Sequence, residues 1–173
     1  MDRTEISAKA QELLDKYSVV LSPTVDAAEL AIRMGFEVFN ADLDADDEGF
    51  IAINTNEKAI FGAKTNRVIG ISRNLDLAQK RFVIAHELGH YCLHYDESSP
   101  IYAHRDKRFK GEEEQDVDYF AACLLMPEKP FKAFYRAAKE IFGSNKERIL
   151  SFLSKNFIAP VGSVERRISE LAL

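Results

Sequence analysis

The stretch that decides the fold of this chain is residues 81–90, which read RFVIAHELGH. On a helix, residues four apart lie one turn apart on the same face, so His86 and His90 can direct ring nitrogens towards one point. Most other residues of the stretch are apolar, which predicts a helix that is buried around most of its circumference. Histidines in such a position need polar partners. The pattern therefore predicts a zinc site rather than two solvent-exposed histidines.

Glu87 follows His86 directly and neighbours the face that carries both histidines. A carboxylate at this position is suited to take a proton from water that zinc has activated, because zinc lowers the pKa of a bound water to about 7. The resulting carboxylic acid can then protonate a leaving amine. The His-Glu-x-x-His pattern thus predicts hydrolysis of a peptide bond with Glu87 as general base.

A catalytic zinc site needs a third protein ligand and an open position for water. The best candidate is Glu114, which precedes Asp118 by four residues at the edge of an apolar stripe in the next predicted helix. Asp118 is then placed to orient a histidine ligand from behind. Glu113 is the alternative ligand, because its helical angle points more directly at the apolar stripe. The residues alone leave this choice open.

The rest of the sequence predicts an α+β domain around the histidine helix. That helix should begin at Asp76, which forms a capping-box pattern with Gln79, and end near Tyr95. Further helices are predicted at 3–17, at 23–34 after Ser22, at 112–126, and as two or three amphipathic helices in 130–173. Short β-like runs at 36–39, 49–54, 59–63 and 67–72 predict a small, largely antiparallel sheet.

Composition limits the class of protein. The chain has 173 residues, of which 46% are hydrophobic and 29% charged, as in one ordinary globular domain. The first ten residues are too polar for a signal peptide and no later run reaches membrane-spanning length, so we expect a cytoplasmic protein. The cysteines, Cys92 and Cys123, lie in apolar helical patterns and are expected to be reduced core residues.

Three other features are weaker candidates. His94 lies one turn beyond His90 but has rotated by about 80° from the face of His86, so we do not expect it to bind the metal. The loop after the helix offers possible oxyanion donors, namely Tyr102, His104 and Arg105. Arg166 and Arg167 near the end of the chain suggest a DNA-binding helix, but the net charge of -5 and the apolar residues around them favour packing instead, so direct nucleic-acid binding is not expected.

The two motif blocks resemble the ImmA/IrrE family of metallopeptidases, whose pattern combines Arg-Phe-x-x-Ala-His-Glu-Leu-Gly-His with a later Glu-x-x-Ala-Asn-x-Phe-Ala-Ala-x-Leu-Leu-Met-Pro. Here the second block is residues 114–127, EQDVDYFAACLLMP. The resemblance covers nearly the whole chain. It implies His86, His90 and Glu114 as zinc ligands and Glu87 as catalytic acid and base, which favours Glu114 over Glu113. The chain departs from the family at Val117-Asp118, where Ala-Asn is usual, and at Val83, where Thr is frequent.

From these observations we expect one zincin-like α+β metallopeptidase domain spanning residues 1–173. It would comprise N-terminal helices in 1–34, the sheet and zinc-site helices in 35–127, and C-terminal helices in 128–173. The ligand pattern is gluzincin-like. Because family members act on helix-turn-helix repressors of bacteria and mobile elements, the resemblance implies a limited, regulatory cut in such a cytoplasmic repressor.

Two alternatives belong to other functional classes. One is a binding module that keeps the metal and sequesters a repressor without cutting it. The other is a toxin-like or DNA-associated protein that acts through its C-terminal helices. Glu87 favours the enzyme, because a purely structural zinc site usually has four protein ligands and needs no general base.

Overall fold

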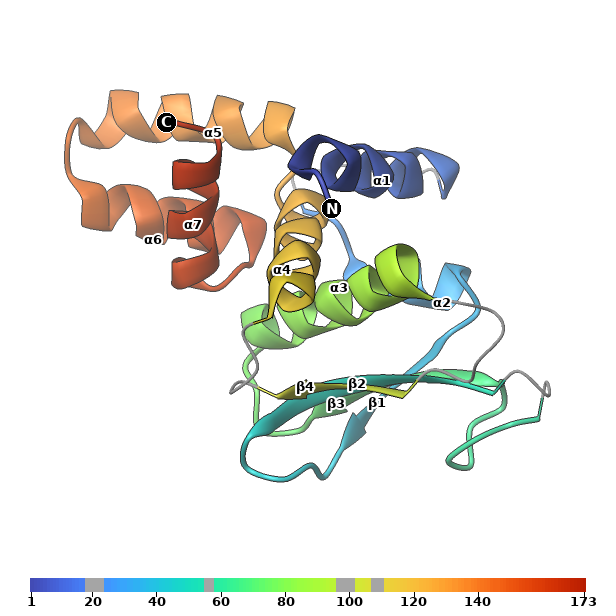
Figure 1. The fold of residues 1–173 in the computed structure, drawn as a ribbon. Coiled ribbons are helices and arrows are strands. Elements are labelled where there is room, and N and C mark those ends of the chain that lie inside the picture. The colour runs from blue at the N-terminus through green and yellow to red at the C-terminus, as the bar shows by residue number, and fades with distance from the viewer. Residues whose placement is uncertain (18–23, 55–57, 96–101, 107–110) are drawn as a thin grey trace.

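A computed structural model describes residues 1–17, 24–54, 58–95 and 111–173, and the backbone alone of residues 102–106. The described residues form an α+β fold in which a small sheet is covered on one face by helices (Figure 1). None of the described helices combines the length and the apolar composition that crossing a bilayer requires.

The sheet has four strands in the order β1-β3-β2-β4. The strands are β1 (Glu37–Ala41), β2 (Asp47–Ile53), β3 (Arg67–Ser72) and β4 (Tyr102–Asp106). Strand β3 pairs with β1 in parallel and with β2 antiparallel, and β2 also pairs antiparallel with β4. The sheet is therefore mixed, and two of its three pairings are antiparallel, in line with the expectation.

The strand predicted at 59–63 is wrong. This segment contains a turn in which Phe61 and Gly62 have left-handed backbone conformations, with φ of +51° and +73°. Such conformations interrupt the extended backbone that a strand requires. The apolar residues Ile60 and Ala63 instead pack against Phe50 and its neighbours in a small cluster of their own. The apolar residues of this segment therefore belong to a turn that packs on Phe50 and its neighbours, and not to a strand.

The helices agree closely with the predicted ones. They are α1 (Arg3–Lys16), α2 (Ala27–Arg33), α3 (Leu77–His94), α4 (Glu112–Leu125), α5 (Glu128–Phe142), α6 (Lys146–Phe157) and α7 (Val161–Glu170). Helix α3 begins with the predicted capping box: Asp76 accepts from the backbone N–H of Gln79, and the Gln79 side chain accepts from that of Asp76. The start predicted for helix 23–34 is wrong: residues 24–26 are not helical, and α2 begins at Ala27, where the side chain of Asp26 caps it by accepting from two backbone N–H groups, whereas Ser22 itself lies outside the described residues.

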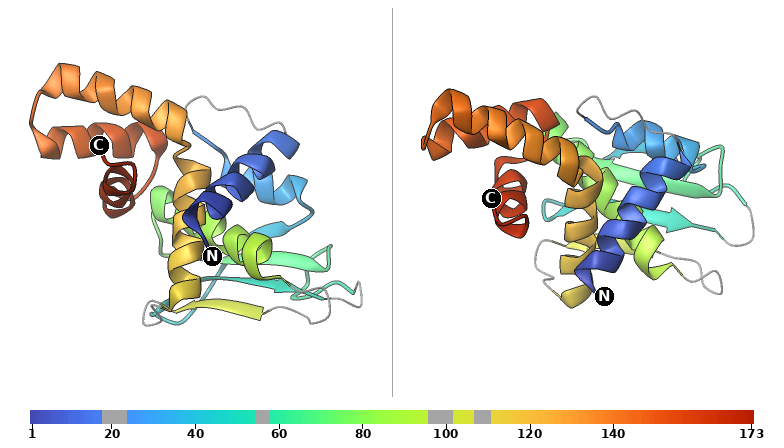
Figure 2. Two further views of the ribbon diagram at one scale, coloured as in Figure 1. Left: turned by 45° about the horizontal axis from the view of Figure 1, so that its top comes forward. Right: turned by 90° about the horizontal axis from the view of Figure 1, so that it is seen from above.

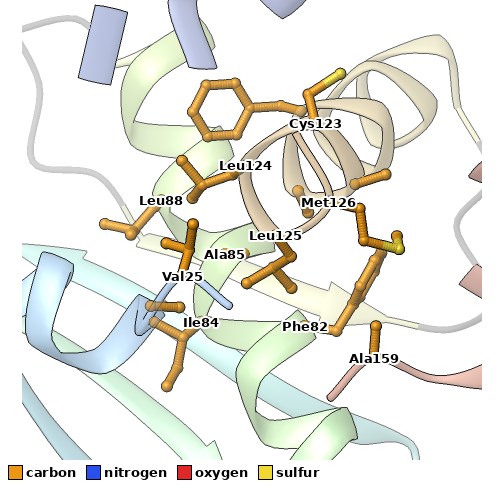
Figure 3. Packing of buried hydrophobic residues seen from close by; sticks show 14 of the residues in the cluster. Val25, Phe82, Ile84, Ala85, Leu88, Cys123, Leu124, Leu125, Met126 and Ala159 are labelled. Carbon is orange, nitrogen blue, oxygen red and sulfur yellow. The ribbon is translucent and has the colours of Figure 1, made fainter. Parts of the chain in front are cut away.

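Helix α3 lies at the centre of the core, between the sheet and α4 (Figures 1 and 3). Every residue from Phe82 to His90 is buried, which explains why the sequence is apolar around this helix. In Figure 3, Leu124 and Leu125 of α4 lie against the α3 residues Ala85 and Leu88. Helices α5, α6 and α7 form a group beside the far end of α4 (Figure 2).

Candidate metal centre

Helix α3 presents two buried imidazoles to each other. His86 is 1% exposed and His90 is 8% exposed, and their Nε2 atoms lie 3.1 Å apart. This proximity follows from the four-residue spacing on one helical face, as the sequence predicted. If one of these two nitrogens carries a proton, it can donate to the other, and if neither does, the two lone pairs face each other and can bind one cation.

Glu114 of α4 joins the two histidines. Its Oε2 lies 3.2 Å from Nε2 of His86, and its Oε1 lies 3.4 Å from Nε2 of His90. Three ligands bound at about 2.1 Å to one tetrahedral ion lie about 3.4 Å from one another. The observed separations therefore fit a single divalent ion, and the donor set of two imidazoles and a carboxylate suits a catalytic site. Among the described residues this group is the one that could hold a metal.

The close approach of α4 to α3 depends on Gly89. A Cβ atom at this position would lie 2.8 Å from Cγ1 of Val117 and 3.3 Å from the carbonyl oxygen of Val117. The absence of a side chain at Gly89 lets the two helices cross closely enough for Glu114 to contact both histidines. Glu113, the alternative ligand, is exposed to solvent.

The two histidines also determine the charge state of Glu114 when no metal is bound. Burial alone would raise the pKa of its carboxyl group, but the hydrogen bond with His86 and, when the two rings are protonated, the charges of His86 and His90 outweigh burial. The pKa of Glu114 is consequently lowered, which keeps the carboxylate ionised and able to donate electron pairs.

Asp118 stands behind His86. Its Oδ1 lies 3.0 Å from Nδ1 of His86, and its Oδ2 accepts a hydrogen bond from Nη1 of Arg166 at 2.9 Å. In a neutral His86 ring whose Nδ1 donates to Asp118, Nε2 is unprotonated and its lone pair faces Glu114 and His90. The arrangement fixes both the tautomer and the direction of the ring.

Glu87 is fully buried on the neighbouring face of α3. Its Oε1 lies 3.5 Å from the position that a Cβ atom would take at Gly49 of β2. A side chain at Gly49 would also collide with Val83 of α3, so this glycine lets the strand and the helix approach beside Glu87. A carboxylate withdrawn from bulk water next to a metal ligand is well placed for proton transfer.

Of the other four candidate residues, the structure describes His94 in full and only the backbone of the remaining three. His94 is exposed, its ring centroid lies 6.2 Å from that of His90, and it does not join the three-ligand group. Tyr102, His104 and Arg105 belong to strand β4, where a loop was predicted, and their side chains lie outside the described part of the chain.

The two cysteines are free thiols, and Cys123 is buried while Cys92 is partly buried. Burial raises the pKa of Cys92 to about 12 and also raises the pKa of Cys123. Both thiols therefore stay neutral near pH 7, as the expectation of reduced core residues requires.

Sequence reasoning missed the role of the C-terminal arginines. Arg167 is 1% exposed, donates to the backbone oxygen of Met126 and contacts Glu170. Arg166 contacts Asp118, as described above, and lines a hollow of about 170 Å³ beside the site. The hollow is also lined by Glu48, Gln79, Phe82, Asp118, Pro160 and Ser163. No local sequence signal links Arg166 to Asp118, because the pairing depends on how α7 packs.

One family model and two related proteins match more than half of this chain. The family model of the IrrE N-terminal-like domain matches residues 31–169. Uncharacterized immunity region protein 2 of Bacillus phage phi105 is 31% identical over 125 residues, which cover 72% of this chain and 70% of that protein. Metallopeptidase ImmA of Bacillus subtilis strain 168 is 33% identical over 101 residues, which cover 55% of this chain and 58% of that protein.

Among solved structures, a Mycobacterium tuberculosis transcriptional regulator matches with a TM-score of 0.57 and 18% identity, over 96% of this chain. At this identity the likeness concerns the fold alone. The match spans 46% of the regulator and 58% of the Bacillus subtilis metallopeptidase, so this chain corresponds to about half the length of each.

Proposed function

Because this chain belongs to the ImmA/IrrE family of metallopeptidases, we propose that it is a zinc-dependent endopeptidase that makes a limited, regulatory cut in a cytoplasmic protein. The observation that carries the proposal is the group of His86, His90 and Glu114, with spacings that suit one ion. Glu87, buried next to His86, adds the carboxylate that peptide hydrolysis needs.

In this proposal His86, His90 and Glu114 hold the zinc ion. The bound ion supplies Lewis acidity, which polarises the peptide carbonyl and makes water a stronger nucleophile. Glu87 accepts the proton of the attacking water as its oxygen bonds to the carbonyl carbon. Glu87 then delivers that proton to the amide nitrogen as the C–N bond breaks, so that a carboxylic acid and an amine are released. Asp118 keeps the His86 ring in the productive orientation.

The single-domain organisation and the zincin-like arrangement form part of the same proposal. One continuous apolar core includes Ile6 of α1, Leu88 of α3 and Val164 of α7. The core supports treating residues 1–173 as one unit, in which the sheet lies on one side of α3 and the glutamate-bearing helix α4 lies on the other.

We propose a helix-turn-helix transcriptional repressor as the substrate. The proposal draws on the family resemblance and on the phage relative, whose name places it in an immunity region. The DNA-associated alternative is weakened, because Arg167 is buried and Arg166 forms an ion pair with Asp118 within the protein. The sequestration alternative shares the metal site with the enzyme, so it has to be separated by experiment.

A repression reporter in cells separates cutting from sequestration. The reporter is driven by a promoter that a candidate helix-turn-helix repressor controls, and the chain is expressed as parent, Glu87→Gln or Glu113→Gln. Glu113 is exposed and does not belong to the group of His86, His90 and Glu114, so its variant makes the same change of charge without removing a member of that group. The proposal predicts relief of repression by the parent and by Glu113→Gln, and none by Glu87→Gln. Equal relief by all three, with equal protein levels, supports sequestration instead.

A further inference from the structure

A chain of three side chains connects the last helix of the described fold to the metal centre. Arg166 of α7 donates through Nη1 to Oδ2 of Asp118 at 2.9 Å. Asp118 of α4 lies, through its other oxygen, 3.0 Å from Nδ1 of His86 on α3. The two oxygens of one carboxylate therefore contact an arginine on one side and a candidate metal ligand on the other.

Because its two oxygens have different partners, the carboxylate of Asp118 is restricted in how it can rotate. The side chain of Asp118 is 23% exposed, so water can compete for its oxygens and allow other rotamers. An aspartate held at only one oxygen can rotate its carboxylate and still keep that contact. When the second oxygen is held by a guanidinium, whose charged hydrogen bond is stronger than a neutral one, rotation breaks a contact. Arg166 thus limits the orientations from which Asp118 meets His86.

Arg167 explains how Arg166 comes to this position. The guanidinium of Arg167 is buried and donates to the backbone oxygen of Met126, at the end of α4. It also lies 5.7 Å from the centre of the Tyr119 ring, again on α4. These contacts fix α7 to the helix that carries Glu114 and Asp118 (Figure 1). The adjacent Arg166 is then placed to contact Asp118, although Arg166 itself is 56% exposed.

We infer that Arg166 is a positioning residue of the metal centre, which acts through Asp118 to hold the His86 ring in the direction that metal binding needs. The inference rests on the proposed function, since it assumes that His86 binds a metal. It assigns to helix α7 a part in the site, exerted through Asp118, in addition to its part in the core. Arg166 also lines the hollow beside the site, so metal affinity is a cleaner readout of positioning than substrate turnover.

The expected size of the effect follows from the geometry. Removing a group that directly orients a metal ligand typically weakens metal binding by about 10-fold to 100-fold. Arg166 acts one residue further away and is more exposed, so its ion pair is partly screened by water. We therefore expect Arg166→Ala to weaken zinc binding by about 3-fold to 10-fold. Arg166→Lys should recover part of the loss, because it keeps the charge but not the planar donor group.

The experiment measures zinc affinity by competition with a chromophoric chelator and records the visible absorption of the Co²⁺-loaded protein. Arg136→Ala is the matched control, because Arg136 is an exposed arginine of α5 that is absent from the site. The variant Asp118→Asn tests whether Arg166 acts on the metal centre through Asp118. Asparagine keeps an acceptor oxygen for His86 but removes the ion pair with Arg166. In that background Arg166→Ala should cause no further loss.

Each outcome decides between the two claims. A parent protein that binds no zinc contradicts the proposed function itself. A parent that binds zinc, with Arg166→Ala binding equally well and giving the same Co²⁺ spectrum, overturns only the role of Arg166. An undiminished effect of Arg166→Ala in the Asp118→Asn background also overturns it, because the arginine would then act by another route. Thermal unfolding of the metal-free variants verifies that folded proteins are compared, and Arg166→Lys carries the comparison if the alanine variant fails to fold.

Discussion

Replacing Gly89 by alanine should push helices α3 and α4 apart and thereby weaken the metal centre. The added Cβ atom would lie 2.8 Å from Cγ1 of Val117, whereas ordinary contact begins at 3.4 Å, so a displacement of about 0.6 Å is needed. Val117 and Phe120, the side chains that meet the new atom, are both completely buried and have little room to yield. The displacement must then be taken up by α4, which carries Glu114.

The substitution should change both the free energy of unfolding and the affinity for zinc. Overpacking costs about 1 to 3 kcal/mol, and the better helix propensity of alanine offsets about 1 kcal/mol, so the free energy of unfolding should fall by about 0 to 2 kcal/mol. Metal affinity should suffer more. A shift of about 0.6 Å in Glu114 is about three times the tolerance of about 0.2 Å on ligand distances, and we expect zinc binding to weaken about 10-fold or more.

Urea unfolding at 25 °C and competition for zinc measure these two effects. Gly162→Ala is the matched control, because Gly162 lies in helix α7 and a Cβ atom there meets nothing within 4 Å. This control should gain up to about 1 kcal/mol from helix propensity and bind zinc as the parent does. If Gly89→Ala behaves like Gly162→Ala in both assays, the close helix crossing does not govern the position of Glu114, and the reasoning is refuted.

Three further predictions concern single side chains. Chelation of the metal should lower the melting temperature of the parent but not that of His90→Ala. Free zinc at 100 times its Kd should add about 2.7 kcal/mol to the free energy of unfolding of the parent. Equal melting curves of the parent with and without zinc would contradict this prediction. His94→Ala should keep its zinc, and loss of the ion in this variant would show that the ligand set is wrong. Burial raises the pKa of Cys92 from 9.0 to about 12, so its stabilising contribution is complete below about pH 9 and lost as the pH rises towards 12. The free energy of unfolding of the parent should accordingly fall relative to that of Cys92→Ala over this pH range. If the two proteins change in stability in the same way with pH, the pKa of the Cys92 thiol is not raised.

The features that the sequence predicted well are those determined within one element. The capping box at Asp76 depends on residues three apart, and the contact between His86 and His90 depends on residues four apart on one helix. The apolar surroundings of these histidines likewise predicted burial correctly. Such patterns need no knowledge of tertiary packing, because the helix itself fixes the geometry.

The features that the sequence did not determine depend on how elements pack. The helical angle of Glu113 pointed more directly at the apolar stripe, but Glu114 is the residue that reaches the histidines once α4 crosses α3 at Gly89. Strand β4 is a short edge strand of mainly polar residues, so it lacks the alternation that marks a half-buried strand. The contact between Arg166 and Asp118 joins residues 48 positions apart and was invisible for the same reason.

The central claim, that this chain cuts a protein by means of the metal centre, is tested most directly by mass spectrometry of a purified candidate substrate. A candidate helix-turn-helix repressor is incubated with zinc-loaded parent protein, with zinc-loaded Glu87→Gln, and with parent from which zinc has been removed. The proposal predicts two new fragments, whose masses add up to the repressor plus one water, with the loaded parent only. Glu87→Gln should retain its zinc and yield no fragments. An intact repressor that forms a stable complex with the loaded parent, or equal cleavage by Glu87→Gln, would contradict the claim.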